Sequence, residues 1–259
     1  ILLSDLIISN NQANSGGGII VEGIGGAWNG EAHVIVENVI FSGNQATGNG
    51  GGYSVYDDYV STLFKSVTFV NNAAGGSGGG MHIYGMSHYA VLANSILWNN
   101  FPDDVIGTVF PHYSNLNGGI NGMGNFTSDP LFIDSTDFHL QQESPCVDAG
   151  SALVIINLDS LMLLGENWMG DTIINLNPAY YSGNSPDMGR YESPFTGSFS
   201  GPVWHISTMG SDSTGDGSGN NPFASIQYGL DSANDGDTVL VEPGTYIENI
   251  IWPQKNGLQ

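Results

Sequence analysis

The sequence predicts an all-β fold, a right-handed parallel β-helix in which one chain winds into stacked, strand-rich coils (a single-stranded solenoid). Three observations lead to this prediction. The chain repeats itself with a period close to 28 residues. Its β-rich segments are short and alternate with period two, without helical spacing of apolar residues. Asn and Gly, which favour tight turns, separate these segments, and the 259 residues include 38 glycines.

Three features carry the repeat with matching spacing. Apolar anchors stand 33, 28 and 28 residues apart: Ile8, Phe41, Phe69 and Leu97. An Asn follows each anchor three positions later: Asn11, Asn44, Asn72 and Asn100. Glycine triplets follow in step: 16–18, 50–52 and 78–80. Stacked coils superpose equivalent positions at about 4.8 Å. We therefore expect Phe41, Phe69 and Leu97 to form an inward apolar ladder. Asn44, Asn72 and Asn100 should form a corner ladder, with glycines supplying positive φ.

The later part of the chain departs from the repeat. We therefore expect four regions in the chain: coils in 1–128, an irregular C-terminal cap or closing region in 129–195, a linker in 196–202, and the cap helix and first coil of a second β-helix in 203–259. In the last region Phe223, Ile226 and Leu230 fall on one face of a short amphipathic helix. The stretch 156–168 is also compatible with a helix.

Three segments together resemble known proteins. The F-x-x-N and GGG repeats resemble right-handed parallel β-helix proteins of the pectin-lyase-like superfamily. The run DPLF…DFHLQ…SPCVDAG…PDMGRYE resembles the closing region of bacterial surface proteins called choice-of-anchor Q domain proteins, and STMGSDSTGDG…EPGTYIENI resembles the opening of such β-helices. The resemblance implies a secreted or cell-surface bacterial protein. It says less about activity, because the superfamily includes lyases, hydrolases and adhesins.

A closing region that precedes an opening region suggests one period of a tandem array, cut out of phase. The chain also starts at Ile1, without Met, in what reads as the middle of a strand. We therefore expect an internal piece of a longer protein. Its partners would be neighbouring copies of itself or adjacent β-helix domains, stacked end to end, because the ends of such a stack carry unpaired strand edges.

Composition restricts the classes of partner. The chain has 25 Asp and Glu against 3 Lys and Arg, a net charge of −22. Such a surface repels phosphate backbones, which argues against nucleic acid. It attracts cations, and Ca²⁺ takes carboxylate, Asn and carbonyl oxygens. Cys146 is the only cysteine, so no intrachain disulfide forms. No apolar run reaches the roughly 18 residues of a membrane span.

The catalytic residues of the superfamily are poorly represented. Its lyases generally use Arg or Lys beside calcium, and this chain offers only three basic residues, which do not cluster: Lys65, Arg190 and Lys255. We read Lys65 as outward and solvated and Arg190 as paired with a nearby acid. The acid pairs Asp57–Asp58 and Asp103–Asp104 are the candidates for a hydrolase. Neighbouring strand residues face opposite ways, so each pair would supply one acid per face. We expect a solvated turn at Asp57–Asp58, which lies between strands, and a turn or a calcium loop at Asp103–Asp104.

Binding residues are easier to suggest. The stretch MHIYGMSHY places His82, Tyr84, His88 and Tyr89 close together, and Tyr56 lies in the preceding repeat. On adjacent coils these residues would form an outer aromatic strip that stacks on sugar rings. The alternative is that they pack under the loops between the strands. A glycine-rich turn contains Asp212, Asp216 and Asn220. We expect either that these side chains bind calcium or that they form hydrogen bonds within the turn.

These observations favour a non-catalytic extracellular scaffold, adhesin-like, that presents an acidic rod and binds glycan or calcium. The alternative is a carbohydrate-active enzyme, a polysaccharide hydrolase or lyase, that works through acids or calcium in a surface groove.

Overall fold

The structure is a computed structural model of the whole chain, and it describes residues 1–22, 32–56, 60–84, 89–155, 172–195, 203–219, 221–255 and 257–258. The predicted helix-compatible stretch 156–168 lies outside these residues. The chain divides into two compact units, Ile1–Phe195 and Thr196–Gln259. Each unit is described by itself.

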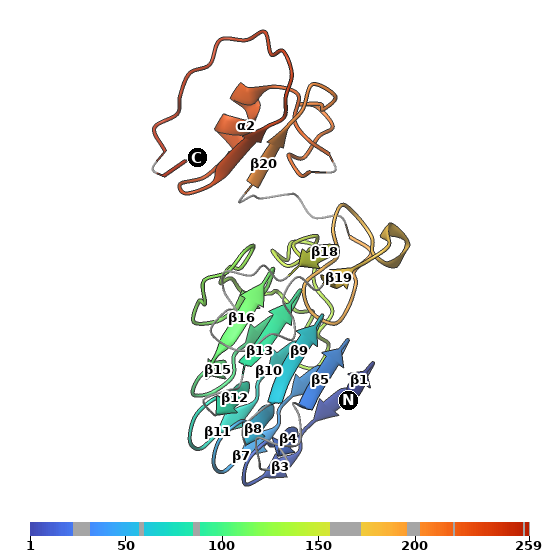
Figure 1. Cartoon of the computed structure of the whole chain (residues 1–259), viewed down its shortest axis with the longest axis vertical. Helices are drawn as coiled ribbons and strands as arrows, with labels where there is room; N and C mark the ends of the chain where they lie inside the picture. Colours follow the sequence, from blue (N-terminus) through green and yellow to red (C-terminus); the bar gives the residue numbers. More distant parts are fainter. Residues whose placement is uncertain are drawn as a thin grey trace. The chain divides into compact units, whose positions relative to one another are not determined.

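Four parallel sheets build the first unit (Figure 1). We name each sheet by its first strand. The β1 sheet contains β1 (Leu2–Ser4), β5 (Ala32–Glu37), β9 (Val60–Lys65), β13 (Tyr89–Ala93) and β16 (Val109–His112). The β2 sheet contains β2 (Ile7–Ser9), β6 (Ile40–Ser42), β10 (Thr68–Val70), β14 (Ile96–Trp98) and β17 (Asn115–Leu116). The β3 sheet contains β3 (Gln12–Ala13), β7 (Gln45–Ala46) and β11 (Ala73–Ala74). The β4 sheet contains β4 (Ile19–Glu22), β8 (Tyr53–Tyr56), β12 (Met81–Tyr84) and β15 (Val105–Ile106). Each sheet takes one strand from each successive repeat.

The apolar anchors of the repeat meet inside these sheets. Phe69 pairs in register with Phe41 on one side and with Leu97 on the other. All three are fully buried, and the rings of Phe41 and Phe69 stack with centroids 4.3 Å apart. Since every repeat contributes to one continuous core, no single repeat buries its apolar residues alone.

The glycine triplets stack backbone on backbone at one corner. Only the first glycine of each triplet has positive φ: +58° at Gly16, +69° at Gly50 and +65° at Gly78. The second has a different reason to be glycine. A Cβ on Gly51 would lie 2.4 Å from the carbonyl oxygen of Gly79. The corner therefore needs positive φ at one position and the absence of a side chain at the next.

The closing region does more than cap an end. Its strands β18 (Leu153–Ile155) and β19 (Thr172–Asn175) pair antiparallel and pack on the outer face of the β1 sheet, where Leu63 and Val91 are buried. Another part buries Cys146 and Met188 against Ile96 of the β2 sheet. A 3₁₀ turn, η1, spans Pro178–Tyr180. The closing region therefore packs against two of the parallel sheets.

The second unit is small. Strands β20 (Val203–Ile206) and β21 (Thr238–Val241) pair in parallel, and the expected amphipathic helix is α2 (Ile226–Ser232). The core of this unit consists of Trp204, Ile206, Phe223 and Ala233. Ser225 caps the helix by accepting the N–H of Tyr228.

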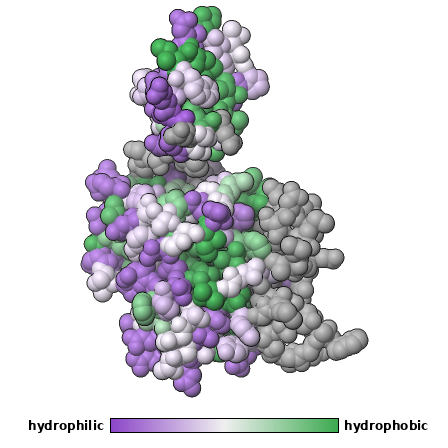
Figure 2. Space-filling model, turned by 90° about the vertical axis from the view of Figure 1, so that its left-hand side faces the viewer, coloured by the Kyte–Doolittle hydropathy of each residue, from purple (hydrophilic) through white to green (hydrophobic). Residues whose placement is uncertain are grey.

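The surface is mixed in character. On the face drawn in Figure 2, hydrophilic and hydrophobic residues are interspersed over the described parts. Within those parts, no helix is both long and apolar enough to cross a membrane.

Candidate functional site

The Asn ladder is the most fully connected polar feature of the first unit. Asn72 Oδ1 accepts hydrogen bonds from the main-chain N–H and side-chain amide of Asn44, at 3.0 and 2.9 Å. Asn72 Nδ2 donates to Asn100 Oδ1 at 2.8 Å and to the carbonyl oxygen of Phe41 at 2.9 Å. Asn11 adds the first step by donating to Asn44. Each amide therefore links its coil to the next one, and Asn44 and Asn72 are almost wholly buried.

Asp104, a candidate acid for the alternative of an enzyme and part of a possible turn or calcium loop, ends this ladder. Its Oδ1 accepts the main-chain N–H of Asn100 at 3.2 Å and the side-chain amide of Asn100 at 2.7 Å. The residue is buried, whereas Asp103 is exposed. Burial raises the pKa of Asp104 to about 6, although the hydrogen bonds from Asn100 oppose this rise. Asp57 and Asp58 lie outside the described residues.

The raised pKa makes the stability of the first unit depend on pH. An acid whose folded pKa is above its ordinary value of 3.8 stabilises the fold below that value, and this contribution is lost as the pH rises through about 6. We predict that Asp104→Asn, which resembles the neutral acid, raises the free energy of unfolding at pH 8 by up to about 3 kcal/mol. At pH 3.5 the variant should match the unmodified protein in urea unfolding.

Asp103→Asn is the matched control, because it makes the same change at an exposed neighbour. It should change the pH dependence far less than Asp104→Asn does, because the charge of Asp103 is the smallest of the causes that act on the pKa of Asp104. Some dependence should survive in every variant, since burial also raises the pKa of Glu192, to about 7. A gain from Asp104→Asn that is equal at pH 3.5 and pH 8 would contradict the assignment.

The predicted aromatic strip is partly present on the outer face of the β4 sheet. Tyr56 and Tyr84 are in register on adjacent strands, 43% and 61% exposed, with ring centroids 5.9 Å apart. The His82 ring lies 5.9 Å from that of Tyr84. His82 itself is buried, and burial lowers its pKa, which favours the neutral imidazole. Two exposed tyrosines and one buried histidine are therefore brought together.

Tyr89 does not belong to this strip, and its assignment to an exposed binding face was wrong. It begins β13 on the β1 sheet, where it is 3% exposed and packs with the strands of the closing region. The repeat pattern places Tyr89 on an outward position but cannot show that another segment covers that position. His88 lies outside the described residues.

The three basic residues all make structural contacts. Lys65 Nζ lies 3.8 Å from Glu37 Oε2, across adjacent strands. Arg190 donates to the carbonyl oxygen of Leu6, and its pairing with an acid stays a prediction. Lys255 donates to carbonyl oxygens at the C-terminal end of α2, where a cation is favourable. These contacts argue against a basic cluster that holds an acidic sugar.

The proposed calcium loop uses its carboxylates locally. Asp212 Oδ1 accepts the N–H groups of Ala224 and Ser225, at 2.8 and 3.0 Å, just before α2. Asp216 Oδ1 accepts the N–H two positions later at 2.9 Å, and Asn220 lies outside the described residues. Among the residues that the structure describes, no three or more His, Cys, Asp or Glu are placed to hold a metal ion. Calcium binding stays a prediction.

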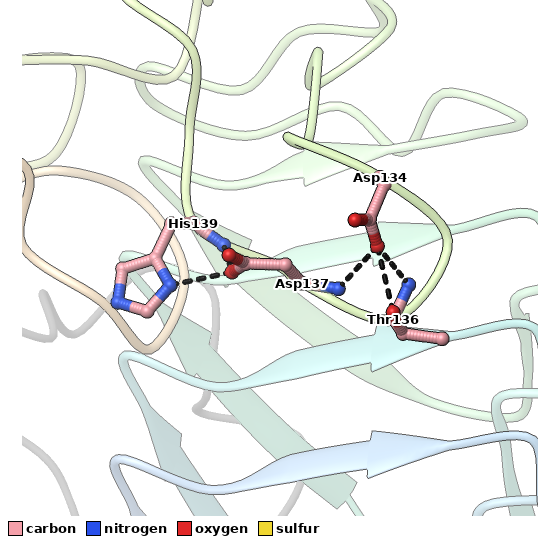
Figure 3. A network of polar contacts seen from close by, with 4 residues as sticks. All are labelled: Asp134, Thr136, Asp137 and His139. Atoms are coloured by element: carbon pink, nitrogen blue, oxygen red, sulfur yellow. Dashed lines mark hydrogen bonds and ion pairs between the residues drawn. The ribbon is translucent and has the colours of Figure 1, made fainter.

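A groove of about 350 Å³, which none of the sequence patterns predicts, lies between the β2 sheet and the loop 129–141. Figure 3 shows part of that loop. Asp134 Oδ1 accepts hydrogen bonds from Thr136 and Asp137, and His139 Nδ1 lies 2.6 Å from Asp137 Oδ1. These hydrogen bonds lower the pKa of Asp134, so this carboxylate stays ionised. Within the loop, the signal in the sequence is the local Asp-Ser-Thr-Asp turn.

Comparison of the chain with protein-family models, with curated proteins and with solved structures finds no match.

Proposed function

We propose that the first unit is a right-handed parallel β-helix and that the chain is a non-catalytic, adhesin-like scaffold of a secreted or cell-surface bacterial protein. The four parallel sheets, each built from successive repeats, support this fold. They are what a stacked solenoid requires, because each coil must pair with both of its neighbours. The second unit would begin the next β-helix of a tandem array.

The buried Asn ladder is the observation that carries the proposal. It joins consecutive coils through hydrogen bonds that use both the amide nitrogen and the amide oxygen of Asn44 and Asn72. A satisfied, buried polar network favours one rigid arrangement over alternatives. Rigidity along the stacking direction suits a rod that holds other groups away from a surface.

The contacts of the charged residues favour a scaffold over a carbohydrate-active enzyme. Asp104, a candidate acid for the enzyme, is buried at the end of the ladder, and Lys65 and Arg190 are used in packing. End-to-end stacking on neighbouring copies or adjacent β-helix domains is the assembly that such a scaffold would use, because unpaired strand edges at the end of a stack invite pairing with another strand.

A turnover screen tests the proposal. The whole chain is incubated with neutral and acidic polysaccharides, with and without Ca²⁺, and new reducing ends and unsaturated products are measured. We expect no turnover under either condition. Turnover that Asp103→Asn or Asp104→Asn abolishes, in a variant whose thermal unfolding shows it folded, would establish the enzyme instead.

A further inference from the structure

The groove between the β2 sheet and the loop 129–141 has a floor that is largely apolar. Val70 is buried there, and the aromatic rings that line it are half-buried: Trp98, Phe132 and Phe138. The rings of Phe132 and Phe138 meet edge to face, with centroids 5.4 Å apart. Such a contact fixes the two rings relative to each other. The groove therefore offers aromatic carbon in defined positions.

The rim of the groove is polar and held in place by hydrogen bonds. Asn99 Nδ2 donates to Asn71 Oδ1 at 2.6 Å, so the other amide atoms, Asn71 Nδ2 and Asn99 Oδ1, supply one donor and one acceptor. Gln141 Nε2 donates to the carbonyl oxygen of Phe132 at 2.7 Å, which leaves its Oε1 as an acceptor. Asp129 Oδ1 is fixed by the N–H of Leu131 at 3.0 Å.

These features select among classes of ligand. The lining residues include two carboxylates, those of Asp129 and Asp134, and no Lys, Arg or His. An anionic ligand is therefore disfavoured. A purely apolar ligand would leave the amides and carboxylates without hydrogen bonds. A volume of about 350 Å³ is at the small end of the range for small-molecule sites.

We propose that this groove binds a neutral saccharide of one or two rings. The C–H faces of the sugar would pack on Trp98 and the phenylalanines, and its hydroxyl groups would exchange hydrogen bonds with the amides and carboxylates of the rim. Several rim groups are already held in place, so little conformational entropy is lost on binding. This site does not depend on the proposed scaffold role, since a groove on the side of the stack neither requires nor excludes end-to-end assembly.

The experiment uses the repeat itself as a source of mild variants. Asn71 and Asn99 have positive φ, +56° in both, and the equivalent position of the preceding coil is Gly43. The double variant Asn71→Gly/Asn99→Gly therefore removes both amides while keeping a backbone that glycine accepts. Asn10→Gly is the matched control, because Asn10 has φ +55°, occupies the same position of the first coil and does not line the groove.

Binding of neutral oligosaccharides of glucose, xylose and mannose to the whole chain is measured by calorimetry and by saturation-transfer NMR. At least one should bind, the double variant should weaken binding at least tenfold, and Asn10→Gly should leave it unchanged. Trp98→Leu should also weaken it, with folding checked by thermal unfolding. The proposal is overturned if no neutral sugar binds, if the double variant binds as well as the unmodified protein, or if only Ca²⁺ or an acidic sugar binds. None of these outcomes bears on turnover or on assembly.

Discussion

Replacement of Asn72 by Leu is expected to lower the free energy of unfolding of the first unit by about 4 kcal/mol, a large share of the stability of a domain. Leu is close to Asn in size, so the loss comes from hydrogen bonding. The change leaves the N–H of Asn44 and the carbonyl oxygen of Phe41 without the partner they have now, whereas Asn100 Oδ1 keeps the main-chain N–H of residue 72. Buried polar groups left unpaired cost about 1–3 kcal/mol each. Urea unfolding followed by circular dichroism measures the loss.

Asn11→Leu is the control for position in the ladder. Asn11 is exposed in the first coil and only donates, to Asn44 Oδ1. Asn44 Oδ1 keeps the main-chain N–H of residue 11 in this variant, so the expected cost is below about 1 kcal/mol. Equal losses at Asn11 and Asn72 would show that the ladder does not stabilise the stack.

The Asn ladder could be predicted from the sequence because its residues recur with the same spacing as the apolar anchors of the repeat. Phe41 and Phe69 stand 28 residues apart, and the strand register pairs them directly. Asp104 could not be predicted as the last acceptor, because it follows Asn100 by only four residues and takes the place of the next repeat. The rule that found the ladder thus fails where the repeat stops.

Segments outside the repeat could not be placed from the sequence, since their positions depend on packing between distant residues. Arg190 reaches Leu6 across 184 residues of sequence, and no local pattern encodes that contact. The burial of Tyr89 has the same cause. The groove combines Asn71 and Asn99, which the repeat spaces regularly, with the irregular loop 129–141, so the repeat predicts only the smaller part of its lining.

The second large effect is expected at the glycine corner. Gly79→Ala should destabilise the first unit by about 4 kcal/mol or more. A Cβ there would lie 2.2 Å from the carbonyl oxygen of Phe101 and 2.5 Å from its nitrogen. Both are main-chain atoms of the next coil, so relief of the clash requires the coils to separate. Thermal unfolding and circular dichroism of the whole chain should show the loss.

Gly76→Ala separates lack of space from loss of flexibility. Gly76 lies close to the same corner, but its Cβ would meet chiefly Asn49 Oδ1, at 2.2 Å, the tip of a side chain that can rotate away at the cost of its hydrogen bonds from Ser77, and the nearest main-chain atom is 3.1 Å away. Both variants restrict the unfolded chain equally, which by itself stabilises a protein slightly. If the glycines served flexibility, the two changes would have similar effects. A much larger loss at Gly79 would show that the corner consists of glycine because adjacent coils leave no room for a side chain. Ligand binding is then expected on the neighbouring surfaces rather than on the glycines.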